Sequence, residues 1–157
     1  MTVNPSSVVD DSAFSVRRTI RIAAPQAKVW EAVTEPEHIS RWFGQAAFEG
    51  SYAGARGTLT WPDRAPIPVR IEAIEAQRMV SYRWGNDDAS GVVSGELDDA
   101  HSTVFTFTLA EVADGTELTV VETGFETTSD PAANLADHRD GWNGELDKLV
   151  TLLESDS

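Results

Sequence analysis

The C-terminal part of the sequence constrains the fold most, because it is the one long stretch in which apolar residues recur at a helical period. A helix starting at Pro131, with Ser129 or Asp130 as its cap, would run for roughly 24 residues and about 36 Å. Such a helix needs a partner surface of similar length. The residues that share its inner side are Leu135, His138, Trp142, Leu146, Leu149, Val150 and Leu153.

The preceding sequence can supply that surface as a sheet, because its apolar residues alternate with polar ones in short runs. Asp114-Gly115 predicts a tight hairpin between the last two runs, and residues 62–66 and 85–95 are predicted loops. The predicted strands cover residues 14–23, 57–61, 67–74, 79–84, 104–112 and 117–123.

Two short helices are predicted between the first strand and the rest of the sheet. The first begins at Pro25, and the second follows Glu35-Pro36 and carries Trp42. We expect Gly44 to end the second helix in a left-handed conformation. The fold class is therefore α+β, with a curved antiparallel sheet wrapped around a long C-terminal helix.

Length and composition predict one ordinary globular domain. The 157 residues divide into a flexible segment 1–13, a domain 14–154 and a flexible tail 155–157.

The formal net charge of −14, without a basic patch, argues against nucleic-acid binding. With no cysteine, disulfides and thiolate metal sites are excluded, and no metal or cofactor motif is recognisable. Neither a membrane span nor a signal peptide is present in the pattern, so a cytoplasmic protein without membrane insertion is predicted.

Several motifs, in order, cover most of the chain from Val16 to Glu154. They are Ala24-Pro25 with Val29-Trp30, Glu35-Pro36 with Arg41-Trp42-Phe43-Gly44, Gly115-Thr116-Glu117-Leu118, Val121-Glu122-Thr123-Gly124-Phe125, and Gly141-Trp142 with Leu146, Leu149 and Leu153. Their order and spacing resemble the START-like (SRPBCC) superfamily. Within it they are most similar to bacterial relatives of the C-terminal domain of the activator of heat-shock protein 90 ATPase.

The resemblance implies a helix-grip fold with a cavity between the sheet and the long helix. Similar domains bind lipids, sterols, polyketides or plant hormones there, a few are cyclases or hydrolases, and the eukaryotic relative stimulates a chaperone. Our leading hypothesis is binding or carriage of a small hydrophobic molecule by a monomer or dimer. A cyclase- or hydrolase-type enzyme and a chaperone-associated or other protein-interaction module remain alternatives, although no catalytic motif is recognisable.

The candidate ligand-binding residues are mostly aromatic residues predicted to face inward. They are Trp42, Phe43, Trp61, Tyr82, Trp84, Phe105, Phe107, Glu122, Leu135, His138 and Trp142. Aromatic side chains in such positions are also typical of an ordinary core, and apolar burial would supply most of the binding energy of a ligand among them.

Three polar residues lie at positions where the pattern predicts burial. Glu122 and Arg18 share strand faces with apolar residues. They form a buried ion pair or lie at the rim, or Glu122 anchors a ligand or acts in catalysis. With the strand parity shifted by one residue, both would face water. His138 is either hydrogen-bonded at the helix rim or orients a ligand. In the enzyme hypothesis, Glu122 and His138 are the acid–base pair.

Gly141 and Gly144 lie inside the predicted helix, where each costs about 1 kcal/mol relative to alanine. Two explanations are open. The glycines let a strand or Trp42 approach the helix closely, or they leave volume for a ligand beside Trp142.

Overall fold

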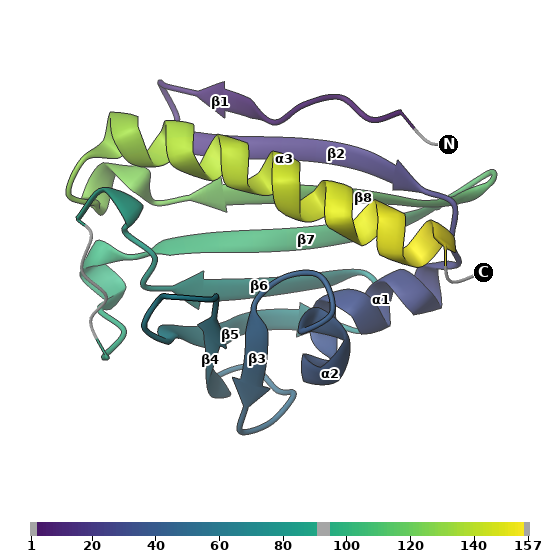
Figure 1. The fold of residues 1–157 in the computed structure, drawn as a ribbon, viewed down its shortest axis with the longest axis horizontal. Helices are drawn as coiled ribbons and strands as arrows, with labels where there is room; N and C mark the ends of the chain where they lie inside the picture. Colours follow the sequence, from purple (N-terminus) through teal and green to yellow (C-terminus); the bar gives the residue numbers. More distant parts are fainter. Residues whose placement is uncertain (1–2, 91–94, 156–157) are drawn as a thin grey trace.

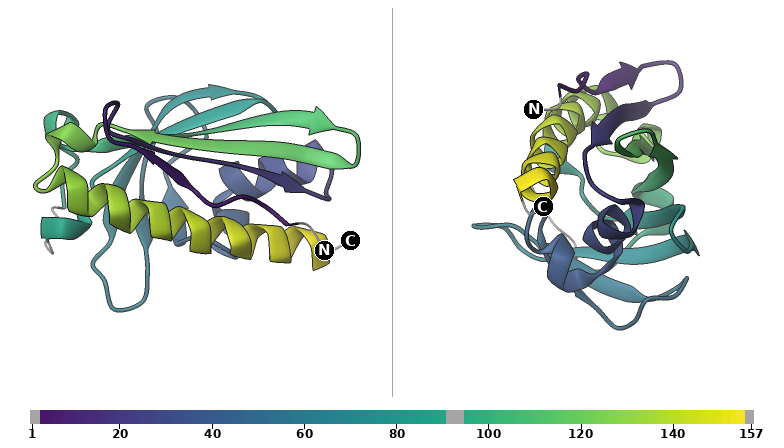
Figure 2. Two further views of the ribbon diagram at one scale, coloured as in Figure 1. Left: turned by 90° about the horizontal axis from the view of Figure 1, so that it is seen from above. Right: turned by 90° about the vertical axis from the view of Figure 1, so that its right-hand side faces the viewer.

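The computed structural model describes residues 3–90 and 95–155, which form a curved antiparallel sheet with a long helix across its concave face (Figures 1 and 2). The strands are β1 (Val8–Asp10), β2 (Ser15–Ile22), β3 (Gln45–Phe48), β4 (Arg56–Thr60), β5 (Ile67–Glu75), β6 (Met79–Trp84), β7 (Thr103–Val112) and β8 (Gly115–Thr123). The helices are α1 (Gln26–Thr34), α2 (Pro36–Ile39) and α3 (Pro131–Ser155), with short 3₁₀ turns η1 (Asp88–Ser90), η2 (Asp99–His101) and η3 (Phe125–Thr127). This architecture confirms the predicted helix-grip fold.

The sheet follows the order β1-β2-β8-β7-β6-β5-β4-β3. The β7–β8 hairpin has Val112 opposite Gly115, as the Asp114-Gly115 signal predicted. Gly115 has φ of 155° and lies so close to the carbonyl oxygen of Ile22 that a side chain would not fit there. Strand β8 is central and pairs with both β2 and β7 along its length, so a side chain on its concave face is buried from all sides.

Helix α3 lies over β2 and β8 and closes the concave face (Figure 1). Asp130 caps it, because its Oδ1 accepts a hydrogen bond of 3.2 Å from the backbone N–H of Ala133. The side predicted to face the sheet is buried along the whole helix, from Leu135 to Leu153. No helix in residues 3–90 and 95–155 is long and apolar enough to cross a membrane.

Buried aromatic side chains from β6 and from the segment after α2 bind the last carbonyl groups of helix α1. The indole of Trp42 donates to the carbonyl of Ala32 at 2.7 Å, and the hydroxyl of Tyr82 donates to that of Val33 at 2.6 Å. These carbonyls have no partner within the helix, so the two bonds satisfy buried acceptors that would otherwise be costly.

The structure differs from the sequence analysis at both edges of the sheet. Strand β1 pairs with β2 within the segment expected to be flexible, and β3 was not predicted. Residues 1–2, 91–94 and 156–157 of the expected flexible ends and loop lie outside the described residues. Short edge strands have few alternating residues, so periodicity gives them little signal.

The prediction for Gly44 was wrong. Helix α2 ends at Ile39 and Gly44 is not in the left-handed region, so it does not cap a helix. A β-carbon at Gly44 would lie 3.0 Å from the ring of Trp61. The indole thus packs directly on the backbone at Gly44, and a larger residue there would have to displace the ring.

Arg18 is buried on β2 and connects the N-terminal segment to α3. Its Nη1 donates to the carbonyls of Trp142 and Asn143, its Nε to that of Pro5, and its Nη2 to Asp147. The N-terminal segment also contacts α3 directly, through the backbone N–H of Ser7 on Asn143 Oδ1 at 2.7 Å. Carbonyl groups of the N-terminal segment and of α3 thus take the place of water as acceptors for the buried guanidinium.

We expect Arg18→Met to lower the free energy of unfolding by about 2–4 kcal/mol, because the carbonyl groups of Trp142, Asn143 and Pro5 lose the buried guanidinium that donates to them. Asp147→Asn should cost under about 1 kcal/mol, since that carboxylate is largely exposed and water screens the pair. Urea unfolding monitored by circular dichroism measures both. Equal losses in the two variants would contradict the dominant role of the carbonyl contacts.

Candidate functional site

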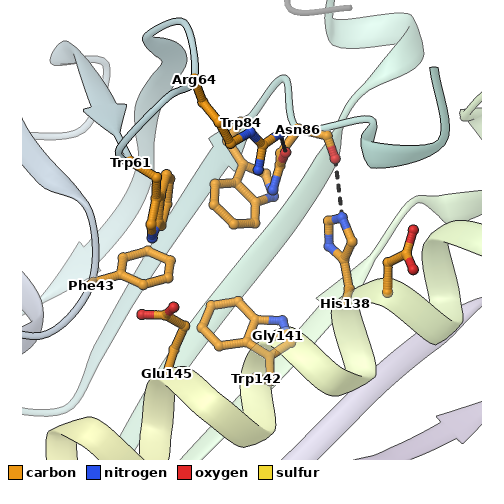
Figure 3. A pocket seen from close by; sticks show the side chains of 10 residues that line it. Phe43, Trp61, Arg64, Trp84, Asn86, His138, Gly141, Trp142 and Glu145 are labelled. Carbon is orange, nitrogen blue, oxygen red and sulfur yellow. Dashed lines mark hydrogen bonds between the residues drawn. The ribbon is translucent and has the colours of Figure 1, made fainter. Parts of the chain in front are cut away.

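A pocket of about 210 Å³ opens between α3, the end of β6 and the loops that follow α2, β4 and β6 (Figure 3). Aromatic side chains form its walls, and polar side chains lie around them. The lining residues are Phe43, Trp61, Arg64, Trp84, Asn86, Asp137, His138, Gly141, Trp142 and Glu145.

The helical wall of the pocket follows the geometry of α3. His138, Trp142 and Glu145 are spaced by four and three residues, so they lie on one side of the helix, with Gly141 between them. Figure 3 shows their side chains directed toward the loop that carries Asn86 and the ring of Phe43.

Gly141 gives the pocket part of its volume. Apart from the adjacent residues and the backbone of α3 itself, a β-carbon at Gly141 or Gly144 would have no atom of the described chain within 4 Å. The expectation that these glycines admit a closely packed strand or Trp42 is therefore wrong at both positions. Both glycines are exposed, but only Gly141 lines the pocket.

The aromatic walls pack against one another as well as against the pocket. Phe43 stacks on Trp142 with 5.5 Å between ring centroids and meets Trp61 edge-on at 5.0 Å. Trp84 lies 5.8 Å from Phe43 and 4.6 Å from Phe105 beneath it. These contacts hold the rings in place, so the pocket is formed before a ligand arrives.

Glu122 lies directly behind the pocket and is fully buried. Its Oε1 accepts hydrogen bonds from the indole of Trp142 at 2.9 Å and from the ring of His138 at 2.7 Å. Its Oε2 accepts from the indole of Trp84 at 2.8 Å and from the hydroxyl of Thr103 at 2.5 Å. One carboxylate therefore fixes both indoles that form the pocket wall and the histidine beside them.

The hydrogen bonds of His138 indicate its protonation state. Nδ1 faces a Glu122 oxygen and Nε2 faces the backbone carbonyl of Asn86 at 3.1 Å (Figure 3), and both of these groups accept. Only the doubly protonated imidazolium can donate to both at once. Glu122 and His138 therefore form a buried ion pair of zero net charge.

The pKa of Glu122 follows from this pairing. Burial acts to raise it, but the charge and hydrogen bond of His138, with the bonds from Thr103 and Trp84, outweigh that effect. The pKa of Glu122 lies below its ordinary value of 4.5. A carboxylate has about four acceptor positions, and the four protein donors already occupy those of Glu122.

The expected pair between Glu122 and Arg18 is wrong, because Arg18 binds α3 carbonyls and Asp147 instead.

The loop after β6 is attached to the start of α3 next to the pocket. Asp87 accepts hydrogen bonds from the backbone and hydroxyl of Ser129 and from the side chain of Asn134. Asn134 in turn accepts from the backbone of Ala89 at 2.9 Å. These bonds hold the pKa of the Asp87 carboxyl below its usual range against the opposing effect of burial. The carbonyl of Asn86 is thereby fixed where His138 needs it.

Glu145 is the carboxylate that reaches the pocket itself. Its side chain is 20% exposed, and Oε2 lies 3.0 Å from Lys148 Nζ. Burial raises its pKa, and the hydrogen bonds from Lys148 and Trp61 offset only part of that effect. Arg64, at the opposite side of the pocket, donates to the side-chain oxygen of Asn86 at 3.2 Å.

The structure divides the predicted ligand-binding residues into three groups. Phe43, Trp61, Trp84, His138 and Trp142 line the pocket. Trp42, Tyr82, Phe105 and Phe107 surround a separate interior void of about 10 Å³, little more than the space of one water. Glu122 and Leu135 are buried in the core.

Sequence reasoning did not propose Arg64, Asn86, Asp137 or Glu145. Glu145 could have been found from helical spacing, because it lies three residues after Trp142 on the side of the helix that carries His138. Arg64 and Asn86 lie in loops without periodicity, so their positions depend on tertiary contacts alone. No group of three or more His, Asp or Glu side chains suited to a metal ion occurs among the described residues.

The comparisons with known proteins agree with this architecture. Residues 23–154 match the family model described as activator of Hsp90 ATPase homolog 1-like protein. A search of the curated protein sequences gives no match.

Several solved structures share the fold. Protein MLL2253 from Mesorhizobium loti is 26% identical with a TM-score of 0.76, over 91% of this chain and 98% of that one. DynU16, a putative protein in the dynemicin biosynthetic locus, is 25% identical with a TM-score of 0.72, over 91% of this chain but only 48% of that one. The Aha1 dimer from Colwellia psychrerythraea, 15% identical with a TM-score of 0.70 over 89% and 96% of the two chains, shows the fold alone.

Stability should depend on acid through Glu122. Because its pKa is lowered on folding, the carboxylate stabilises the fold at pH values above the unfolded pKa of about 4.5, and this contribution is lost as pH falls below that value. Glu122→Gln should cost about 3–5 kcal/mol at pH 7, because an amide nitrogen would meet donors and the imidazolium would lose its partner. Urea unfolding from pH 7 down to about pH 2 measures both effects, since the contribution is lost between the unfolded pKa and the lower folded pKa.

Glu117→Gln on the same strand is the matched control, since Glu117 is partly exposed and 3.8 Å from Arg21. It should change the free energy of unfolding by no more than about 0.5 kcal/mol. A loss in Glu122→Gln as small as this would contradict the buried ion pair.

Nitrogen-15 NMR of the histidine rings tests the protonation state directly. At pH 7 we expect both ring nitrogens of His138 to show shifts of protonated nitrogen, because each faces an acceptor. His101, which is 69% exposed, provides an internal reference for a solvent-exposed ring. A neutral tautomer of His138 at pH 7 would overturn the assignment of an ion pair.

Proposed function

The chain belongs to the family of activator of Hsp90 ATPase homolog 1-like proteins, with the START-like fold, and we propose that it binds a compact aromatic molecule in the pocket beside α3. Family and fold support a ligand-binding domain in general terms. The observation that supports the finer statement is a preformed pocket with walls of Phe43, Trp61, Trp84 and Trp142. Aromatic walls with a few polar groups are typical of small-molecule sites.

The size of the pocket favours small planar ligands over lipids and sterols. At about 210 Å³ it is below the usual range of roughly 300–1,000 Å³ for drug-sized ligands, so one or two fused rings would fill it. The neighbouring interior void of about 10 Å³ is closed by Trp42, Phe105 and Phe107. A fatty-acid chain or a sterol would have to displace this core, which is close-packed and resists such changes.

The hydrogen bonding of Glu122 and His138 supports binding rather than acid–base catalysis. A general base needs a free lone pair within reach of its substrate, and a general acid needs a transferable proton. The Glu122 oxygens accept from four protein donors in the described chain, and both nitrogens of His138 are bonded. The pair acts instead as a rigid support that positions the indoles of the pocket wall.

One similar structure comes from a biosynthetic locus, which is compatible with a chain that handles a small molecule. A protein partner and dimerisation are not needed for the pocket, because one chain supplies all of its lining residues.

The two helical glycines provide a matched test. Gly141→Leu should fill the pocket and abolish binding, whereas Gly144→Leu should leave binding unchanged. Both variants should raise the free energy of unfolding by up to about 1 kcal/mol, because leucine favours the helix more than glycine does. Loss of binding in Gly141→Leu would then not be due to unfolding.

Binding is measured by indole NMR correlations of the five tryptophans, titrated with one- and two-ring aromatics, long-chain fatty acids and sterols. We expect saturable shifts of Trp61, Trp84 and Trp142 with the small aromatics. Shifts only with fatty acids or sterols, or equal binding by both glycine variants, would contradict the proposal.

A further inference from the structure

Resting on the proposed function, we propose that Glu145 selects the ligand, so that the pocket takes an aromatic molecule that carries an amine or another cationic hydrogen-bond donor. The carboxylate lies on the pocket-facing side of α3, three residues after Trp142 and four after Gly141. The missing side chain at Gly141 leaves the space beside it open.

The charges around the pocket favour a cation. Asp137 and Glu145 are acidic, Arg64 is basic, and the buried pair of Glu122 and His138 is neutral as a whole. The lining therefore carries an excess of negative charge, within a protein whose net charge is −14. An anionic ligand would be repelled during its approach and a cationic one attracted.

The aromatic walls of the pocket and the carboxylate of Glu145 both favour a cationic ligand. The faces of indole and phenyl rings carry negative potential that attracts a nearby cation, most strongly for tryptophan. A partly buried carboxylate accepts a stronger hydrogen bond from an ammonium group than from a neutral donor. Burial also raises the pKa of Glu145, so a bound cation would stabilise a charge that the folded protein solvates poorly.

The competing cation of the protein is held away from the pocket interior. Lys148, three residues after Glu145, does not line the pocket, and its side chain is 54% exposed. Water screens the charge of Lys148, so a ligand ammonium can share the carboxylate or replace Lys148. Arg64 lies on the other side of the pocket, beside Asn86 (Figure 3).

Three probes with the same ring system separate charge from shape: 1-naphthylmethylamine, 1-naphthylmethanol and 1-naphthoate. Calorimetry or indole NMR at pH 7 should show the amine binding about tenfold more tightly than the carboxylate, the size of one charge-assisted hydrogen bond. Glu145→Gln should weaken the amine about tenfold and leave the alcohol nearly unchanged. Higher salt should reduce the preference for the amine.

Asp140→Asn is the matched control, because it removes a charge from an exposed position on the same helix, next to Arg139. It should leave all three affinities within about twofold of the original, since exposed charges are screened. If the three probes bind equally, or the carboxylate binds most tightly, the role of Glu145 is overturned while the pocket stands as an aromatic site. If none of the probes binds, the proposed function fails as well.

Discussion

The structure depends on how one carboxylate is accommodated in an aromatic core. Glu122 is on the central strand of the sheet, with no access to water, and an isolated charge there would be prohibitively costly. The protein compensates with donors from several elements, among them Trp84 on β6, Thr103 on β7 and Trp142 on α3. Each donor has to be in place for the others to be useful, so this network couples strand, helix and loop into a single arrangement.

That coupling explains why the pocket lies where it does. Indole rings packed only by apolar contacts could rotate or fill a neighbouring space, but a ring whose N–H is bound to a fixed oxygen has one orientation. The Glu122 carboxylate orients Trp84 and Trp142 from behind, and their outer surfaces become the pocket wall. His138 extends the same support to the loop at Asn86. The buried carboxylate, which is costly in the core, thus fixes the shape of the aromatic pocket beside it.

The sequence predicted the parts of this arrangement that follow from period alone. The parity of β8 placed Glu122 on the buried face, and the spacing on α3 placed His138 and Trp142 toward it, so the three residues were expected on the correct sides. The choice of partner was not predictable, because the pattern placed both Arg18 and His138 on the buried side and only the tertiary structure shows which of them reaches Glu122. Arg18 lies on β2 beneath α3 and meets backbone carbonyls first, which satisfy a guanidinium well.

The same limit applies to the pocket. Inward-facing aromatics were predicted as one set, yet the structure divides them between a closed core around Phe107 and an open site around Trp61. The difference arises from volume. Phe107 lies on the inner strand β7 and is buried among neighbours that leave a void of only about 10 Å³. Trp61 follows the last residue of β4 and packs on the backbone of Gly44. Gly141 completes the contrast, since glycine is unfavourable in a helix and no neighbouring element packs so closely here that a β-carbon would not fit. A residue that weakens its own helix beside a pocket fits the proposed ligand site, because proteins tolerate such losses mainly at functional sites.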